Sequence, residues 1–358
     1  MNRQTAVKQG TKAMANTASP KLQIESIITD ILGTIERERE REIIARRYGL
    51  FDRKETLEQI GELLGITRER VRQLEKAVMA RLKAMADAGQ LPHIQETQTV
   101  LLDAIHAMGK AARVSDLSAQ LTAENSRIDQ ARISFLAALS PKVAVVDEND
   151  HFYHAVGVAE AHDEKTIKDL AAKAIEAIKK IGEPTTIDKV AEHVKLDDPR
   201  HAAALARTSK HLATLNGRWG LVKWPTVNPK NIRDKIYVIL QEAGKHMHFN
   251  EIADSIKDSD FKRKDVTTQA IHNELIKDKR FVLIGRGIYA LKEWGYEKGT
   301  VADIITEVLR KKGEPMHRDE IVKEVLKSRH VKETTILLNL QGKQQFKRVA
   351  KATYALAE

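Results

Sequence analysis

The chain has 358 residues, of which 42% are hydrophobic and 31% charged, and 60 Lys and Arg against 50 Asp and Glu leave a formal net charge of +10. It has no cysteine, which excludes disulfides, thiolate zinc sites and cysteine nucleophiles. No apolar run is close to the length of about 18 residues that a membrane-spanning helix needs. The first 20 residues lack the apolar core of a signal peptide. We expect a cytoplasmic, nucleoid-associated protein with a polyanionic partner, most simply nucleic acid.

The N-terminal part of the chain predicts a tail and a small helical domain. Residues 1–20 lack apolar periodicity, which indicates a disordered tail. From about Leu22 an amphipathic helix follows, and a charged run, 36–42, separates it from a second helical stretch that ends at Gly49. A polar stretch between residues 85 and 97 is typical of a domain boundary, so the first domain spans residues 21–86. The apolar positions of the first helix are Ile24, Ile27, Ile28, Ile31, Leu32 and Ile35.

Residues 56–83 predict a helix-turn-helix. Gly61 permits close helix crossing, and Gly65 can take the left-handed conformation that ends a helix. Thr67 is a good N-cap for a long second helix that runs to about Lys83. Two short helices joined by a tight turn are the arrangement with which many proteins place a helix in the major groove of DNA.

The second helix of this motif presents a polar edge if Val71, Leu74 and Val78 face inward. Arginine pairs with guanine, glutamine with adenine, and glutamate accepts from cytosine in the major groove, whereas cations near the backbone neutralise phosphates. An ordinary solvated face with internal Glu–Arg pairs is the alternative. The predicted base contacts are Arg68, Glu69 and Gln73, and the predicted phosphate contacts are Arg70, Arg72, Lys76 and Arg81.

A resemblance sharpens this prediction. Residues 41–50 (REIIARRYGL), 56–61 (TLEQIG) and 67–75 (TRERVRQLE) resemble region 4 of the primary bacterial sigma factors. That family reads the promoter −35 element with this second helix and works with core RNA polymerase. The resemblance therefore implies promoter DNA and polymerase as partners, the base and phosphate contacts named above, and a further phosphate contact at Thr56.

The rest of the chain repeats itself. Helices that end at a glycine recur, and each repeat closes on an aromatic residue, with successive aromatics 66, 70 and 65 residues apart. Three helices followed by two short strands fit each repeat, which is the winged-helix plan. The glycines are Gly109, Gly182, Gly244 and Gly313, and the closing aromatics are Tyr153, Trp219, Tyr289 and Tyr354.

The predicted fold is therefore mainly α with small β wings, a helix-turn-helix domain followed by four tandem winged-helix units. These units span residues 98–157, 165–225, 230–294 and 299–358. In unit three the strands are expected at 281–284 and 288–292, joined by a glycine turn at 285–287. The aromatics Trp219, Tyr289 and Tyr354 are expected in the small cores under the wings.

Residues 216–224 (NGRWGLVKW) and 281–294 (FVLIGRGIYALKEW) resemble the closing strands of HARE-HTH winged helices, the class of the N-terminal domain of the RNA polymerase delta subunit. The resemblance implies contact with polymerase or DNA. In unit three, a polar cluster at the start of the third helix is a candidate second nucleic-acid face, with a solvated charged face as the alternative. The cluster comprises Lys262, Arg263, Lys264, Thr268, Gln269 and His272.

No catalytic constellation, P-loop or metal motif is found, and His246 and His248 indicate an ordinary helix start. We expect a non-enzymatic protein without cofactor, metal or small-molecule substrate. The predicted function is sequence-specific recognition of a −35-like promoter element in transcription initiation. Two alternatives stay open, a delta-like polymerase accessory subunit without sequence-specific reading and a regulatory subunit of a nucleic-acid-processing complex.

Overall fold

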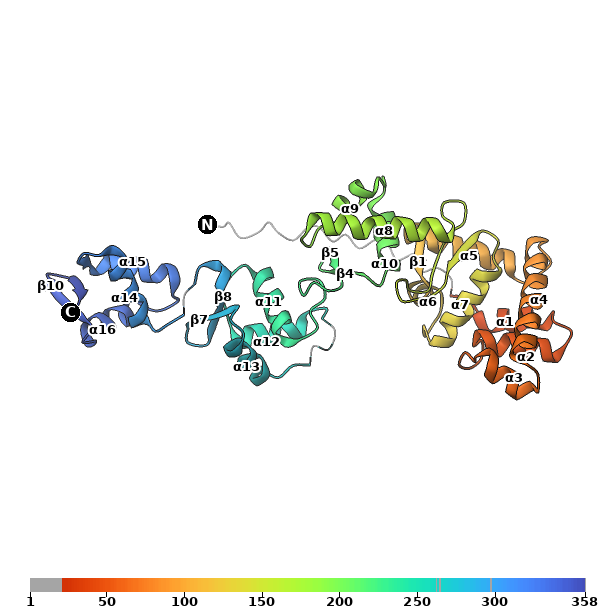
Figure 1. The fold of residues 1–358 in the computed structure, drawn as a ribbon, viewed down its shortest axis with the longest axis horizontal. Helices are drawn as coiled ribbons and strands as arrows, with labels where there is room; N and C mark the ends of the chain where they lie inside the picture. Colours follow the sequence, from red (N-terminus) through yellow and green to blue (C-terminus); the bar gives the residue numbers. More distant parts are fainter. Residues whose placement is uncertain (1–20, 262, 264, 297, 358) are drawn as a thin grey trace, which may run out of the picture. The chain divides into compact units, whose positions relative to one another are not determined.

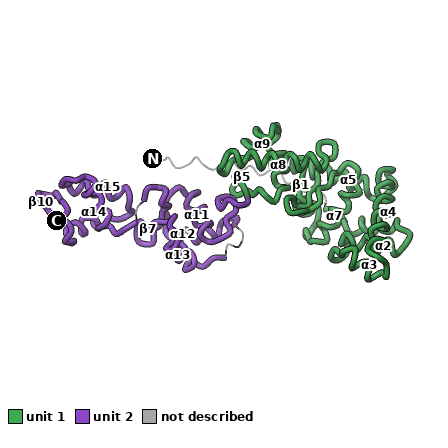
Figure 2. The backbone as a smooth tube through the Cα atoms, viewed as in Figure 1, with its two compact units in different colours: residues 1–221 green, residues 222–358 purple. Residues whose placement is uncertain are grey.

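A computed structural model describes residues 21–261, 263, 265–296 and 298–357. The chain divides into two compact regions, an N-terminal region that ends at Leu221 and a C-terminal region from Val222 (Figure 2). The tail predicted at residues 1–20 lies outside the described residues, as do Lys262 and Lys264. None of the described helices is both long and apolar enough to cross a bilayer.

The predicted helix-turn-helix domain is present, and the apolar positions expected of its first helix are all buried. The charged run after that helix is not a separator, because it forms the first turn of the next helix. Glu38 and Glu40 favour that helix start, and Glu40 is buried between two arginines. The last helix extends four residues beyond the predicted Lys83. The four helices are α1 (Ile24–Gly33), α2 (Glu38–Tyr48), α3 (Leu57–Leu64) and α4 (Arg68–Asp87) (Figure 1).

Winged-helix units one and two complete the N-terminal region, each with three helices and a small antiparallel sheet. Unit one begins at Ile94, four residues before its predicted start. Its elements are α5 (Ile94–Ala107), β1 (Ala111–Arg113), α6 (Val114–Leu121), α7 (Arg127–Leu139), β2 (Val143–Val146) and β3 (Ala155–Val158). Those of unit two are α8 (Glu164–Ile181), α9 (Ile187–Val194), α10 (Pro199–Thr208), β4 (Leu212–Leu215) and β5 (Arg218–Leu221).

Units three and four form the C-terminal region on the same plan. Unit three contains α11 (Ile232–Ala243), β6 (Met247–His248), α12 (Phe249–Asp258), α13 (Thr268–Lys277), β7 (Phe281–Gly285), β8 (Ile288–Leu291) and the short 3₁₀ helix η1 (Lys292–Trp294). Unit four contains α14 (Val301–Lys312), β9 (Met316–His317), α15 (Arg318–Ser328), α16 (Glu333–Gly342), β10 (Phe346–Ala350) and β11 (Thr353–Leu356).

The sheets differ from the predicted pairs of strands. In units one, three and four the closing strand lies in the middle of three, with orders β1-β3-β2, β6-β8-β7 and β10-β11-β9. The additional strands β6 and β9 have two residues each, so the sequence shows no strand pattern there. Unit two has the expected two strands, and an isolated bridge between Thr185 and Trp219 takes the place of the third.

Three of the four closing aromatics lie where they were predicted. Trp219, Tyr289 and Tyr354 belong to closing strands and are buried under the wings. Tyr153 does not, because the closing strand of unit one begins two residues later, at Ala155. The Tyr153 ring is 36% exposed and lies under the Arg113 guanidinium, 3.9 Å from its centroid.

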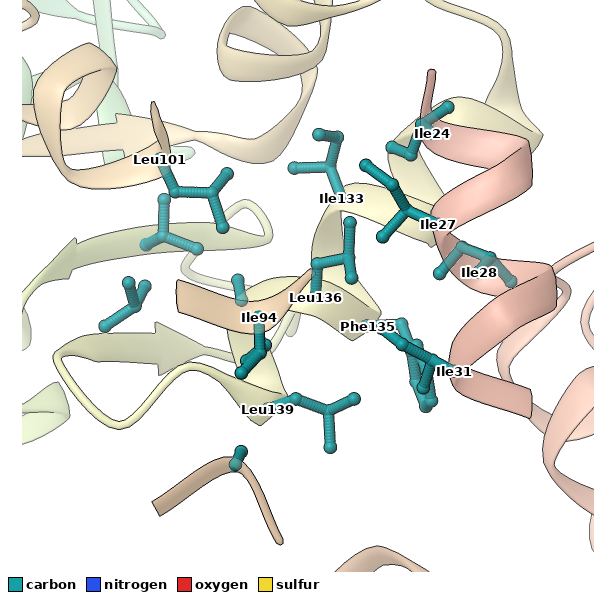
Figure 3. Close-up of a cluster of buried hydrophobic side chains, with 14 of the residues drawn as sticks. Ile24, Ile27, Ile28, Ile31, Ile94, Leu101, Ile133, Phe135, Leu136 and Leu139 are labelled. Atoms are coloured by element: carbon teal, nitrogen blue, oxygen red, sulfur yellow. The ribbon is translucent and has the colours of Figure 1, made fainter. Parts of the chain in front are cut away.

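The helix-turn-helix domain and unit one share one hydrophobic core, although the polar stretch between them indicated a boundary. Figure 3 shows the isoleucines of α1 facing the apolar side chains of α7. The Tyr48 and Phe135 rings meet edge to face at 5.1 Å. The buried Arg132 of α7 donates to the Leu50 carbonyl at 2.7 Å. Helix α7 is therefore enclosed by the preceding domain.

The third helix of unit two is enclosed in a similar way by unit one. The Tyr153 amide donates to the Thr208 carbonyl at 2.9 Å, and the Arg113 side chain donates to the Arg207 carbonyl. A Cβ atom on Gly109 would lie 2.5 Å from the Arg200 carbonyl oxygen, so only glycine allows this approach. By contrast, the third helices α13 and α16 of the C-terminal region bury only two side chains each, those that face their own cores.

Candidate nucleic-acid interface

The turn between α3 and α4 is built as the glycines and threonines predicted. Gly65 ends α3 with φ +63°, and a Cβ atom on Gly61 would lie 2.7 Å from the Ile66 carbonyl oxygen. The Thr67 hydroxyl caps α4 by accepting from the Arg70 amide at 3.2 Å. Ile60 and Val71 are fully buried between the two helices. The start of α4 is thus rigidly placed against α3.

Helix α2 braces both ends of α3. Arg46 pairs with Glu55 at 2.9 Å just before α3 begins, and Arg39 donates to the Leu64 carbonyl at its end. Arg47 also pairs with Glu75 of α4 at 3.4 Å. These contacts tie the helix-turn-helix to the helix that packs behind it, so that the position of α4 depends on α2.

The structure gathers the predicted contact residues of α4 on its N-terminal half. Val71 and Val78 are buried as predicted, and Leu74 is half-buried, so the opposite side of the helix faces solvent. We call this exposed surface the α4 edge. It consists of Arg68, Glu69, Arg70, Arg72, Gln73 and Lys76, all exposed.

Side chains of the α4 edge bond to one another and to α3. The Arg72 guanidinium donates to both carboxylate oxygens of Glu69, at 2.7 and 2.8 Å, and these hydrogen bonds lower the pKa of Glu69. Gln73 donates to the same carboxylate at 3.3 Å, and Arg68 pairs with Glu58 of α3 at 2.8 Å. Solvent screens exposed pairs of this kind strongly, so a polar or charged partner can replace them.

Two predicted phosphate contacts have structural partners. Arg81 pairs with the buried Glu40 of α2 at 3.0 Å, which ties the second half of α4 to α2. Thr56 caps α3 in a capping box, in which its backbone amide donates to the Gln59 side chain at 2.9 Å. The Thr56 amide is therefore occupied, and its hydroxyl accepts from the Gln59 amide at 3.3 Å.

Three further exposed cations of this domain were not predicted as contact residues. Lys83 lines a shallow groove of about 400 Å³ along α4, together with Arg72 and Lys76. Lys83 follows Lys76 by seven residues, which is two helical turns, so both lie on the same side of α4. This spacing could have identified Lys83 from the sequence. Arg53 and Lys54 are exposed immediately before α3.

The polar cluster predicted in unit three is only partly on a helix. Arg263 is exposed in the segment between α12 and α13, with φ +54°, and its carbonyl accepts from Lys235 at 2.6 Å. Helix α13 begins at Thr268, so the basic residues precede it instead of forming its first turn. Gln269 is exposed in that first turn and bonds to Asn273 at 3.1 Å.

Within the part of the chain that the structure describes, no group of three or more histidine, aspartate or glutamate side chains could hold a metal ion. His246, interpreted from the sequence as part of a helix start and not as a metal ligand, stacks on His330 with ring centroids 4.5 Å apart.

Comparison with known proteins finds a family match for the segment that contains the α4 edge. The family described as Sigma-70, region 4 matches residues 37–84. Over 66 residues the chain is 42% identical to RNA polymerase sigma factor RpoD of Helicobacter pylori, which covers 18% of this chain and 9% of RpoD. It is 46% identical over 57 residues to sigma factor sigB of Arabidopsis thaliana (16% and 9%), and 55% identical over 47 residues to principal sigma factor HrdC of Streptomyces coelicolor (13% and 14%).

The chain thus spans about a tenth of the length of the sigma factors named here. The matched stretch contains α2, α3 and nearly all of α4, together with every residue of the α4 edge. Residues 37–84 of this chain are a sigma-70 region 4 domain, a non-enzymatic domain near the N-terminus.

Proposed function

We propose that this protein binds duplex DNA sequence-specifically at a −35-like promoter element and acts in transcription initiation together with RNA polymerase. The observation that carries the proposal is the α4 edge, an exposed row of arginine, glutamate and glutamine side chains on a braced helix inside a region 4 domain. RNA polymerase is the partner named for the relatives, which are sigma factors.

The contacts divide into two kinds. Arg68, Glu69 and Gln73 read base edges, because their side chains offer the donors and acceptors that distinguish base pairs in the major groove. Phosphate contacts carry no sequence information but fix the register. We assign them to Arg70, Arg72, Lys76 and the Thr56 hydroxyl, with Lys83 added along the same groove. Arg81 keeps its ion pair with Glu40 and, since its side chain is 49% exposed, offers its remaining guanidinium N–H groups to a phosphate.

The test compares Arg68→Ala with Lys76→Ala in the full chain. Selection of bound sequences from a random DNA library, with and without core polymerase, first identifies the preferred element. Arg68→Ala is expected to cost about 1–3 kcal/mol on that element and to relax the preference at one base pair. Lys76→Ala is expected to weaken binding to all duplexes alike. If both variants behave identically on every sequence, the division of contacts is wrong.

An accessory role without sequence-specific reading is the second candidate. The enclosure of α7 and α10 favours it, because most of the surface of the third helix, which reads DNA in winged-helix proteins, is covered in units one and two. Salt dependence separates the two candidates. DNA binding through several phosphates gives affinity that falls steeply with salt, whereas protein docking with few ion pairs gives a shallow dependence.

A further inference from the structure

The hairpin of unit four carries an unbalanced charge. Residues 343–357, which include β10 and β11, contain four cations and no acidic residue. All four cations are exposed, and no ion pair of theirs is found among the described residues. We call this set the unit-four wing cations: Lys343, Lys347, Arg348 and Lys351.

The strand register explains why these charges stay unneutralised. Lys347 lies opposite Ala355, and Arg348 lies opposite Tyr354, so no carboxylate faces them across the hairpin. A register shift between Arg348 and Ala350 bends the strand there and leaves the Arg348 side chain exposed. Its guanidinium donates at 3.2 Å to the Ala350 carbonyl.

The other hairpins carry fewer cations: unit three has Arg286 and Lys292 within residues 281–292, and unit two has Arg218 and Lys223 within residues 212–223. The cations just before their first strands are paired. In unit three Arg280 is held by Asp278 at 2.7 Å and by Asp234 at 3.1 Å. In unit two Lys210 pairs with Glu148 at 2.7 Å. The third helix of unit four, α16, contains no lysine or arginine. In unit four, cations therefore lie on the wing hairpin, whereas the third helix has none.

We propose that the unit-four wing cations form a second, sequence-independent nucleic-acid contact, which binds the phosphates of duplex DNA through the hairpin. Unpaired cations on a narrow two-stranded ribbon match a regular row of phosphates. An acidic protein surface fits less well, because protein interfaces are depleted of lysine and rely on aromatic anchors. Val349, 46% exposed, is the one large apolar side chain at the surface of this hairpin.

The experiment uses the full chain and duplex DNA of a sequence unrelated to any selected element. The triple variant Lys347→Gln, Arg348→Gln, Lys351→Gln is compared with Lys165→Gln, Lys173→Gln, Lys180→Gln, which removes the same charge from the exposed side of α8. Affinity is measured over a range of salt concentrations. Each lost phosphate contact lowers the slope of log affinity against log salt by about 0.9, so the hairpin triple should be shallower by about 2–3.

The control triple is expected to keep the wild-type slope. Lys347→Arg with Lys351→Arg should keep it too, since the charge is retained. An unchanged slope in the hairpin triple, or an equal loss in both triples, overturns the proposal. The proposed function is tested separately, because the base preference selected from a random library depends on the α4 edge and should be the same in the hairpin triple and the wild type.

Discussion

The third helices of the winged-helix units fall into two groups. In the N-terminal region, α7 and α10 are enclosed by the domain that precedes each of them. In the C-terminal region, α13 buries only Ile271 and Leu275, and α16 buries only Ile336 and Leu340. The same plan therefore serves two purposes, since an enclosed third helix joins domains and an exposed one is available to a partner.

The region 4 domain has one covered side and one open side. Its apolar side is covered by α7, and its polar side is the α4 edge. Compared with the third helices α7 and α10 of the same region, α4 has an open polar edge, while α7 of unit one packs behind it. A count of winged-helix units therefore overstates the number of DNA-reading helices in this chain.

The largest expected effect is on the shared core. Phe135 is fully buried in α7 and touches Tyr48 of the region 4 domain. Phe135→Ala should lower the free energy of unfolding by about 3–5 kcal/mol, because it removes the ring and leaves a cavity. Since the core is shared, hydrogen exchange should accelerate in α1 and α2 as well as in α7. Chemical denaturation and hydrogen exchange of the full chain measure both effects.

Leu338→Ala is the matched control on an exposed third helix. Leu338 of α16 is 67% exposed, so its truncation should change the stability by less than about 0.5 kcal/mol. If Phe135→Ala left α1 and α2 as protected as in the wild type, the two domains would not share a core and the comparison would fail.

Acid should weaken the enclosure of α10 specifically. His201 of α10 lies against His162, with ring centroids 4.6 Å apart and both side chains buried. Burial, the neighbouring His162 and Lys110 lower the pKa of His201 to about 4, with Asp198 opposing them, and burial lowers the pKa of His162. Unfolded histidine has a pKa of about 6.5, so the unfolded state binds more protons between pH 6.5 and 4.

The contribution of this histidine pair to the free energy of unfolding is therefore fully present above pH 6.5 and is lost as the pH falls towards 4. For His201 the loss is at most about 3.5 kcal/mol, from about 2.5 pKa units at about 1.4 kcal/mol each. The wild type should lose more stability over this range than His201→Gln, as urea denaturation at each pH would show. Equal losses in the two proteins would mean that the pair does not titrate with unfolding.

Local signals made the region 4 domain predictable. Gly65 and Thr67 mark the end of one helix and the start of the next, and both act within a single turn of chain. The spacing of Val71 and Val78 fixes which side of α4 faces solvent. The α4 edge follows from these few residues, and whether its members contact DNA stays a prediction.

Non-local contacts could not be predicted in this way. The bond from Arg132 to the Leu50 carbonyl joins residues 82 apart, and nothing in the pattern of α7 shows which domain covers it. The ion pair between Arg81 and Glu40 joins residues 41 apart, and nothing in the charged run 36–42 shows which arginine this carboxylate meets. The two-residue strands β6 and β9 are defined by their partners alone.

The smallest expected effect tests whether an exposed third helix reads DNA while an enclosed one does not. Gln269 is exposed in the first turn of α13, whereas Gln130 of α7 is half-buried and bonds to Asn125 at 3.1 Å. If α13 meets DNA, Gln269→Ala should cost about 1 kcal/mol of binding free energy, the value of one hydrogen bond. Gln130→Ala should leave DNA affinity unchanged, because its side chain serves the fold. Titration of the selected duplex with each variant decides between them: a loss in Gln130→Ala without a loss in Gln269→Ala would reverse the assignment of the two helices.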